Sequence, residues 1–161
     1  MIRLTRLADY AVLLMTHMGH EWDRDRSKLH NANSLSTDTH IPAPTVAKIL
    51  GVMSRGHLLT STRGQAGGYR LARDPEEITV AQIISVVDGP IALTECIEDG
   101  PGECNIESLC SVRTAWQKIN DAIRGALSEI TLAELCADQS AMFDIPASSE
   151  PAPARPVTEI Q

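Results

Sequence analysis

The sequence predicts a mainly α-helical protein with one small β-hairpin, arranged as a winged helix–turn–helix domain followed by a long dimerisation helix. Three observations predict this fold. Apolar residues recur at helical spacing in two segments before residue 56, a turn rich in glycine and arginine separates two β-prone runs after it, and one apolar stripe runs through residues 112–127. The 161 residues, 43% of them hydrophobic, suffice for one compact domain and an appendage.

The first predicted helix runs from Thr5 to about Met18, where small and aliphatic residues share one face and Thr5 suits the N-cap. The segment His20–Asn33 is charged and aperiodic, so it predicts a loop or a frayed extension of the first helix. Residues Ser34–His40 predict only a short helix, because serine and threonine have low helix propensity.

A stronger helix follows, and it opens with prolines, which the first helical turn tolerates. Pro42 and Pro44 precede its apolar stripe, and Gly56 stands where a C-cap belongs. The residues of this stripe are Val46, Ile49, Leu50 and Met53.

Two short β-prone runs, Leu58–Thr62 and Tyr69–Leu71, enclose the turn Arg63–Gly68 and predict a hairpin with an irregular tip. A capping box at Thr79–Gln82 then opens another helix, which ends at Gly89. This order of helices and hairpin is typical of a winged helix–turn–helix.

The element order predicts double-stranded DNA as the partner. The second helix of the turn would lie in the major groove, and the hairpin would reach the adjacent backbone or the minor groove. An arginine at a glycine-rich tip can enter a narrow minor groove, where the negative potential is strongest. A plain surface helix and an ordinary hairpin with a solvated arginine are the alternatives. The candidate DNA-binding residues are Thr45, Lys48, Arg55, Arg63, Gln65, Gly67 and Arg70.

The net charge of −7 does not exclude this partner, because charge is divided unevenly along the chain. Residues 1–73 carry ten Lys/Arg and five Asp/Glu, whereas residues 74–161 carry four and sixteen. A basic front can therefore face phosphate while an acidic back keeps the protein soluble. No apolar run approaches the roughly 18 residues of a membrane helix, and the N-terminus does not resemble a signal peptide. We therefore expect a cytoplasmic protein with no membrane partner.

Three cysteines, Cys96, Cys104 and Cys110, lie in a segment rich in glycine and acidic residues. Cytosolic thiols stay reduced, so metal binding or redox sensing is favoured over disulfides. Three thiolates can close round an iron–sulfur cluster or a zinc ion, although the C-x-x-C spacing of a zinc ribbon is absent. Three free surface cysteines are the remaining alternative. Cys136, on the last amphipathic helix, is expected to be a buried structural cysteine.

A cluster needs a fourth ligand in most geometries. Asp9 of the first helix is a carboxylate among apolar neighbours, and it is either a simple surface residue or a candidate ligand. The histidines, among them His30, His40 and His57, are expected mostly to face solvent or the DNA groove.

The apolar stripe of residues 112–127 needs a covering surface, and a second copy of the chain is the natural candidate. The chain thus divides into a DNA-binding domain (1–90), a cysteine-rich segment (91–111), a dimerisation helix with a short C-terminal helix (112–138) and a disordered tail (139–161). The expected dimer interface comprises Val112, Trp116, Ile119, Ile123 and Leu127.

Several motifs follow one another along residues 1–138: LTRLADYA, PAPTVAKIL, RGQAGGYRLAR, PEEITVAQII and the three-cysteine loop. Together they resemble the bacterial iron–sulfur regulators of the IscR and NsrR type. Within that family, GPIALTEC and SVRTAWQKINDAI are most similar to the regulators of the SUF cluster-assembly operon. The resemblance implies a homodimeric winged-helix repressor or activator that senses iron–sulfur status.

By the same resemblance Cys96, Cys104 and Cys110 hold the cluster, Thr45 and Lys48 lie on the recognition helix, and the wing arginine, Arg63, enters the minor groove. A winged-helix protein with a structural zinc site, or with no metal, is the alternative function. A thiol oxidoreductase would need a C-x-x-C pair or a base beside its nucleophile, and the sequence offers neither. We therefore expect no enzymatic activity and no small-molecule substrate.

At the position of the fourth ligand, this chain differs from one branch of the family and matches the other. IscR-type members take it from a histidine three residues after the third cysteine, and this chain has Arg113 there. NsrR-type members use an aspartate from the first helix of the partner subunit, and Asp9 matches that position. The cluster type, [2Fe–2S] or [4Fe–4S], stays open at this point.

Overall fold

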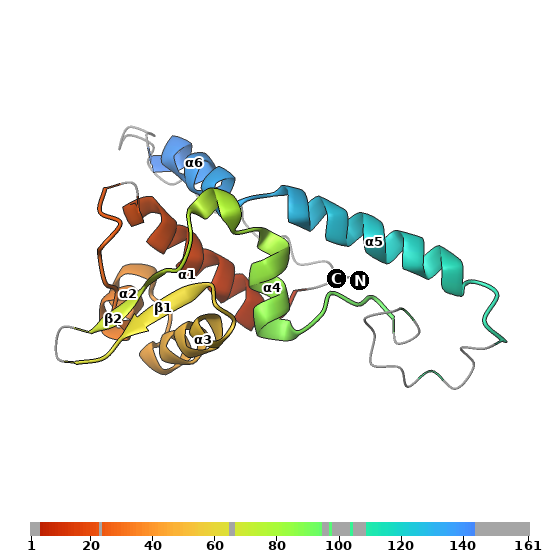
Figure 1. The fold of residues 1–161 in the computed structure, drawn as a ribbon, viewed down its shortest axis with the longest axis horizontal. Coiled ribbons are helices and arrows are strands. Elements are labelled where there is room, and N and C mark those ends of the chain that lie inside the picture. Colours follow the sequence, from red (N-terminus) through yellow and green to blue (C-terminus); the bar gives the residue numbers. More distant parts are fainter. Residues whose placement is uncertain are drawn as a thin grey trace, which may run out of the picture.

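The computed structural model describes residues 4–22, 24–64, 67–94, 97, 104 and 109–143, with residues 138–143 described as backbone only. The described elements, in chain order, are α1 (Arg6–Trp22), α2 (Ala32–Thr39), α3 (Ala43–Arg55), β1 (Leu59–Thr62), β2 (Gly68–Leu71), the 3₁₀ turn η1 (Pro75–Glu77), α4 (Val80–Asp88), α5 (Arg113–Glu129) and α6 (Leu132–Phe143). Figure 1 shows α1 at the centre, with α3 and the hairpin on one side, α6 on the other, and α5 extending away from the group.

One hydrophobic core joins α1, α3 and the base of the hairpin. Leu14 and Met15 of α1 are buried in the same cluster as the whole predicted stripe of α3. Leu59 and Leu71, which face each other in the hairpin register, belong to this cluster as well. Burying one such aliphatic side chain contributes about 1.5–3 kcal/mol. The core therefore fixes the orientation of α3 relative to the hairpin, which confirms the predicted winged helix–turn–helix.

Thr5 caps α1, as predicted. Its hydroxyl oxygen accepts a hydrogen bond from the Ala8 N–H at 3.1 Å, and the hydroxyl donates to the Asp88 carboxylate at 2.8 Å. The helix continues to Trp22, so the first residues from His20 on form the expected extension of the helix and not a loop. The reason is tertiary: the Trp22 side chain packs against the core and holds the last turn helical.

The predicted short helix exists as α2, and it begins two residues earlier than expected. The Asn31 side chain caps it by accepting from the Ser34 N–H at 2.9 Å. Thr37 and Thr39 donate their hydroxyls to carbonyl oxygens one turn earlier, and Leu35 is fully buried. Capping and one buried anchor thus compensate for the low intrinsic helix propensity.

His30 pairs with the hairpin through an isolated antiparallel bridge to Tyr69 of β2. Its backbone N–H and C=O exchange two hydrogen bonds with Tyr69 of β2, both at 2.8 Å. The His30 side chain is buried, so the expectation that it faces solvent or the DNA groove is wrong. His40 and His57 are exposed, as expected, and both adopt positive φ angles in the turns before and after α3.

The predicted capping box opens α4, with both reciprocal hydrogen bonds between Thr79 and Gln82 present. After α5, the Thr131 hydroxyl accepts from the Glu134 N–H at 3.2 Å and caps α6. α6 extends to Phe143, so its last residues fall in the segment that the sequence assigns to a tail; residues 144–161 lie outside the described residues. No helix of the described part is long and apolar enough to cross a membrane.

Burial gives His30 a defined effect on stability. It lowers the pKa of the imidazole below the ordinary value of 6.5, and the nearby Lys28 and His17 act in the same direction. As pH falls through 6.5, the unfolded chain takes up a proton that the folded chain still resists. We therefore expect the free energy of unfolding to decrease below pH 6.5, until the pH reaches the lowered pKa of the folded state.

Urea denaturation between pH 7.5 and 5.5 measures this effect. His30→Gln should show a smaller loss of stability over that range than the wild type does. His57→Asn, which changes an exposed histidine, should retain the wild-type loss. Equal losses in the wild type and His30→Gln would contradict the assignment.

Candidate nucleic-acid interface and metal centre

The outer face of α3 carries three of the predicted DNA-binding residues. Lys48 and Arg55 are exposed and Thr45 is half-buried, while the opposite face lies in the core. Gly51 lies between the two cations, and the nearest heavy atom to a Cβ added there would be the Arg55 guanidinium nitrogen at 3.6 Å. The Arg55 side chain therefore lies back along the outer face of α3 towards Gly51.

The tip of the hairpin has a compact backbone that demands glycine. Gly64 has a φ of 119°, which other residues rarely adopt. The Gly67 N–H donates to the Gly64 carbonyl at 3.0 Å, and a Cβ on Gly67 would lie only 2.3 Å from the Thr62 carbonyl oxygen. Arg63 is exposed beside this tight turn, and Gln65 lies outside the described residues. Arg63 is thus presented to solvent beside a turn in which Gly64, by its φ angle, and Gly67, by its close neighbours, leave no freedom or space for a larger residue.

Ion pairing separates the basic residues of the first 73 positions into two groups. Lys48, Arg55, Arg63 and Arg70 form no ion pair within the part of the chain that the structure describes. Arg70 donates its Nε–H to the Thr60 hydroxyl at 3.3 Å across the hairpin, which steadies the side chain but leaves its charge uncompensated. All four of these cations lie on α3 or the hairpin.

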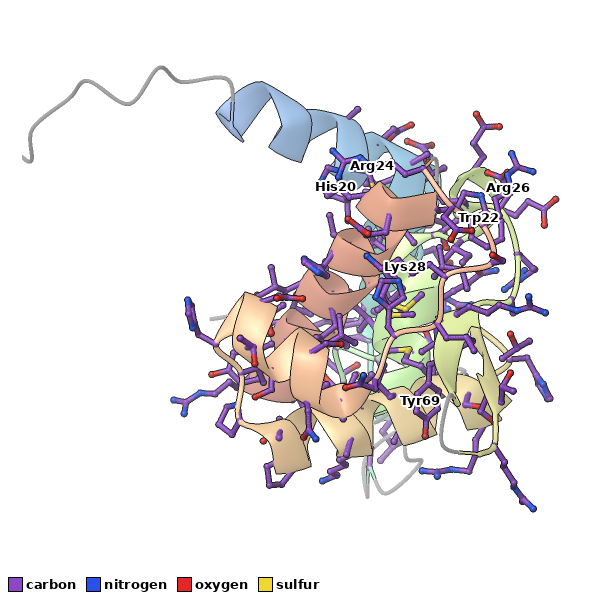
Figure 2. All side chains as sticks on the ribbon, turned by 90° about the vertical axis from the view of Figure 1, so that its left-hand side faces the viewer. His20, Trp22, Arg24, Arg26, Lys28 and Tyr69 are labelled. Carbon is purple, nitrogen blue, oxygen red and sulfur yellow. The ribbon has the colours of Figure 1, made fainter. Side chains whose placement is uncertain are left out.

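The cations between α1 and α2 are paired. Arg24 and Lys28 both contact the Glu21 carboxylate, and Arg26 lies 3.7 Å from Asp74. The hydrogen bond from Lys28 is the main reason why the pKa of Glu21 lies below its ordinary value. Figure 2 shows the three cations along the connection between the two helices. Each of these cations contacts a carboxylate, whereas six basic residues of the described part of the first 73 positions form no ion pair: Arg6, Lys48, Arg55, Arg63, Arg70 and Arg73. Four of these six lie on α3 or the hairpin.

Two of the three predicted metal ligands lie in the described residues. Cys104 and Cys110 are free thiols of intermediate burial, and Cys96 lies outside the described residues. The Cys110 carbonyl accepts the Arg113 N–H at 3.4 Å, so this cysteine immediately precedes α5. Within the described residues no three potential ligands come together.

Asp9 is exposed in the first turn of α1. Figure 1 shows that the first turn of α5 lies away from α1, and Cys110 precedes this turn by three residues.

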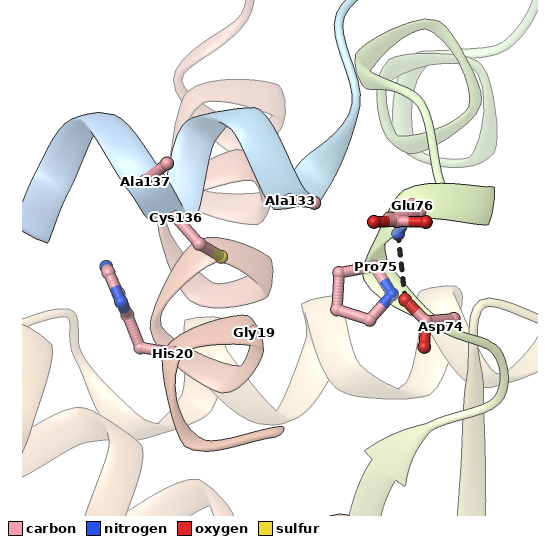
Figure 3. A pocket seen from close by; sticks show the side chains of 8 residues that line it. All are labelled: Gly19, His20, Asp74, Pro75, Glu76, Ala133, Cys136 and Ala137. Atoms are coloured by element: carbon pink, nitrogen blue, oxygen red, sulfur yellow. Dashed lines mark hydrogen bonds between the residues drawn. The ribbon is translucent and has the colours of Figure 1, made fainter. Parts of the chain in front are cut away.

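Cys136 of α6 is half-buried and packs against the core, which agrees with a structural role although the burial is incomplete. Its thiol donates to the Thr16 carbonyl at 3.5 Å, and Gly19 gives it room, because a Cβ there would lie 2.5 Å from the sulfur. It lines a pocket of about 210 Å³ between α1, η1 and α6, with His20 on one side and Glu76 on the other (Figure 3).

The predicted dimer stripe of α5 divides into two parts. Val112, Trp116 and Ile119 are 51%, 38% and 45% exposed, which is unusual for large apolar side chains on one face. Leu127 instead packs against a buried cluster of its own chain formed by α1 and α4, and Ile123 is half-buried. The exposed part of the stripe therefore lies towards the cysteine end of the helix.

Asn120 is a residue that the sequence did not single out. It is the one described residue of α5 that is fully buried, and its side chain accepts a hydrogen bond from the Leu93 N–H at 3.1 Å. The only signal in the sequence is a polar residue next to the apolar stripe, which is common on any amphipathic helix.

The family model described as Rrf2, iron-dependent transcriptional regulator, matches residues 4–138. The HTH-type transcriptional regulator IscR of Escherichia coli O1:K1 is 29% identical over 141 residues, which make up 88% of this chain and 84% of that protein.

Solved structures share the fold. CymR (YrzC), the global cysteine regulator of B. subtilis, superimposes with a TM-score of 0.66 at 23% identity, over 86% of this chain and 98% of CymR. IscR of T. potens superimposes with a TM-score of 0.65 at 21% identity, over 91% of this chain and 94% of that one.

Proposed function

The chain belongs to the Rrf2 family of iron-dependent transcriptional regulators, and on this premise we propose how it reads DNA and what it senses. It is a DNA-binding transcription regulator, as its relatives are, and not an enzyme. We propose that it acts in the cytoplasm as a homodimer whose iron–sulfur cluster controls binding to operators of SUF cluster-assembly genes. The observation that carries the proposal is the surface of α3 and the hairpin, where four cations lie without carboxylate partners.

On this proposal α3 enters the major groove, where Thr45 and Lys48 near its N-terminal half reach bases and phosphates. Arg55 meets the backbone at the other end of the helix. The hairpin places Arg63 in the minor groove, and its compact tip lets backbone approach phosphate. Gln65, Gly67 and Arg70 complete the contact surface.

Replacing Arg63 tests this orientation. We expect Arg63→Ala to weaken binding by about 1–2 kcal/mol, or about five- to thirtyfold, most strongly on duplexes with a narrow minor groove. The slope of log affinity against log salt should decrease by about one for each lost phosphate contact. Fluorescence anisotropy on duplexes selected by the wild type from a random pool measures both quantities.

Arg24→Ala is the matched control, because it removes an exposed arginine that is already paired with Glu21. It should leave affinity within about twofold of the wild type, since balanced surface charges contribute little. Equal affinity of Arg63→Ala and the wild type would remove Arg63 from the interface.

A second copy of the chain is the proposed cover for the exposed stripe of α5. Large apolar side chains at two or more successive turns need a partner surface, and a twofold dimer supplies an identical one. Segment 112–138 then serves as the dimerisation region and residues 1–90 as the DNA-binding domain, with residues 139–161 as a tail beyond both.

We expect Ile119→Glu to shift the protein from dimer to monomer at micromolar concentration, because it places a charge in the apolar contact. Analytical ultracentrifugation measures the change. Ser128→Glu adds the same charge to an exposed position of the same helix and should remain dimeric. A dimer that tolerates Ile119→Glu without loss of affinity would place the interface elsewhere.

The donor chemistry of the cysteine segment fits an iron–sulfur cluster. Cys104 and Cys110 are free and not fully buried, and thiolates are the usual ligands of such clusters. We propose Cys96 as the third ligand and Asp9 of the partner subunit as the fourth, since Arg113 cannot serve and Asp9 is exposed. A bound cluster, [2Fe–2S] or [4Fe–4S], supplies a redox-active and oxidant-sensitive group. Holding these ligands together would order segment 91–111 and change the spacing of the two α3 helices relative to their half-sites.

Removing one thiol tests the ligand set. We expect Cys104→Ala, purified without oxygen, to lose the visible absorption of the cluster together with iron and acid-labile sulfide. Cys136→Ala, which changes the half-buried cysteine of α6, should retain all three. A full spectrum in Cys104→Ala would remove this residue from the ligands, and zinc without sulfide in the wild type would replace the sensor with a structural metal site.

A further inference from the structure

Asn120 differs from every other described residue of α5. The apolar side chains of this helix are partly exposed, whereas the Asn120 amide is 0% exposed. Burying an amide is costly unless its polar atoms find partners. The position therefore needs an explanation beyond the packing of an amphipathic helix.

The buried amide is bonded to the segment that leads into the cysteines. Its Oδ1 accepts the Leu93 N–H at 3.1 Å, and because Leu93 offers a donor, the oxygen has to face it. Leu93 stands three residues before Cys96, and Ile97, directly after Cys96, is buried at 4% exposure. On one side of the first cysteine Leu93 is thus hydrogen-bonded, and on the other side Ile97 is buried.

The other half of the amide is unsatisfied. Asn120 Nδ2 is buried and has no acceptor among the described residues. A leucine of similar volume would fill the position without an unpaired donor. Packing alone does not account for an asparagine here, and the hydrogen bond to Leu93 is the interaction that the amide provides.

We propose that Asn120 is a positioning residue that couples the cysteine segment to α5, and through α5 to the arrangement of the two subunits. This inference rests on the proposed cluster sensing. Drawing the three cysteines together constrains the backbone just before Cys96, and the bond from Leu93 to Asn120 transmits that constraint to the middle of α5. Such coupling is reciprocal, so its loss reduces the effect of cluster loading on DNA binding.

The test compares DNA affinities of cluster-loaded and cluster-free protein in full-length variants. Asn120→Leu removes the acceptor and keeps the volume, and Asn120→Asp keeps an oxygen opposite Leu93. Ser128→Leu is the matched control on the exposed side of α5. Hydrogen exchange of the Leu93 amide reports on the bond itself, and ultracentrifugation reports on the dimer.

We expect Asn120→Leu to load iron and sulfide normally, remain dimeric and exchange the Leu93 amide faster. The ratio of DNA affinities, that of the tighter-binding form (cluster-loaded or cluster-free) divided by that of the other form, should fall about two- to tenfold. A change of this size corresponds to the loss of one hydrogen bond. Asn120→Asp should restore most of the wild-type ratio, and Ser128→Leu should not change it. If Asn120→Leu does not fold, Asn120→Ser, whose side chain is too short to reach Leu93, should show the same reduced ratio.

Each contrary outcome has a distinct meaning. If the wild type shows a ratio of DNA affinities above one and Asn120→Leu shows the same ratio, the coupling is overturned and the proposed sensing is not. Equal losses in Asn120→Leu and Asn120→Asp also overturn it, because the change then reflects a disturbed helix and not the bond. A wild-type ratio of one overturns the proposed sensing, and the coupling with it.

Discussion

Two backbone hydrogen bonds determine where α5 and α6 lie. The Val80 N–H donates to the Ile130 carbonyl at 3.0 Å, and the Leu132 N–H donates to the Ile78 carbonyl at 2.8 Å. This short antiparallel pairing joins the start of α4 to the link between α5 and α6, and Ile78 and Leu132 are fully buried there. Because the chain is held at this point, α6 returns onto α1 while α5 leaves the domain. The position of the exposed stripe of α5 depends on that pairing.

Sequence patterns were sufficient where local signals and burial agree. The α3 stripe, the Thr79 capping box and the glycine-rich tip all lie where periodicity and turn chemistry place them. The patterns failed where a distant contact decides the outcome. His30 is buried because it pairs with Tyr69, which lies far along the chain, and Asn120 is buried because a backbone N–H from another segment meets it. No local period encodes either pairing. The set of metal ligands is the part that is hardest to predict from the sequence, because in our proposal it comprises residues of two subunits.

Net charge is a poor guide to the partner of this protein. The chain is acidic overall, and its first 73 residues contain basic positions whose charge is balanced by Glu21 and Asp74. Charge attracts phosphate only where it is uncompensated and accessible. Among the described residues of the first 73 positions, six cations have no carboxylate partner, and four of them lie on α3 and the hairpin. Pairing, and not composition, is therefore the property that identifies a DNA-facing surface in an acidic regulator.

The projection of α5 also has a mechanical consequence. Its 17 residues give a rod about 25 Å long, held near its C-terminal end by the pairing beside Ile130 and the packing of Leu127, and in its middle by the hydrogen bond from Leu93 to Asn120. Because the helix is long, a small rotation about its C-terminal end displaces its N-terminal end considerably: a rotation of about 10° corresponds to a displacement of about 4 Å. This displacement exceeds the rise of about 3.4 Å between successive base pairs. In a dimer joined through such helices, the combined stiffness of these attachments sets how accurately the two α3 helices can match the spacing of their half-sites.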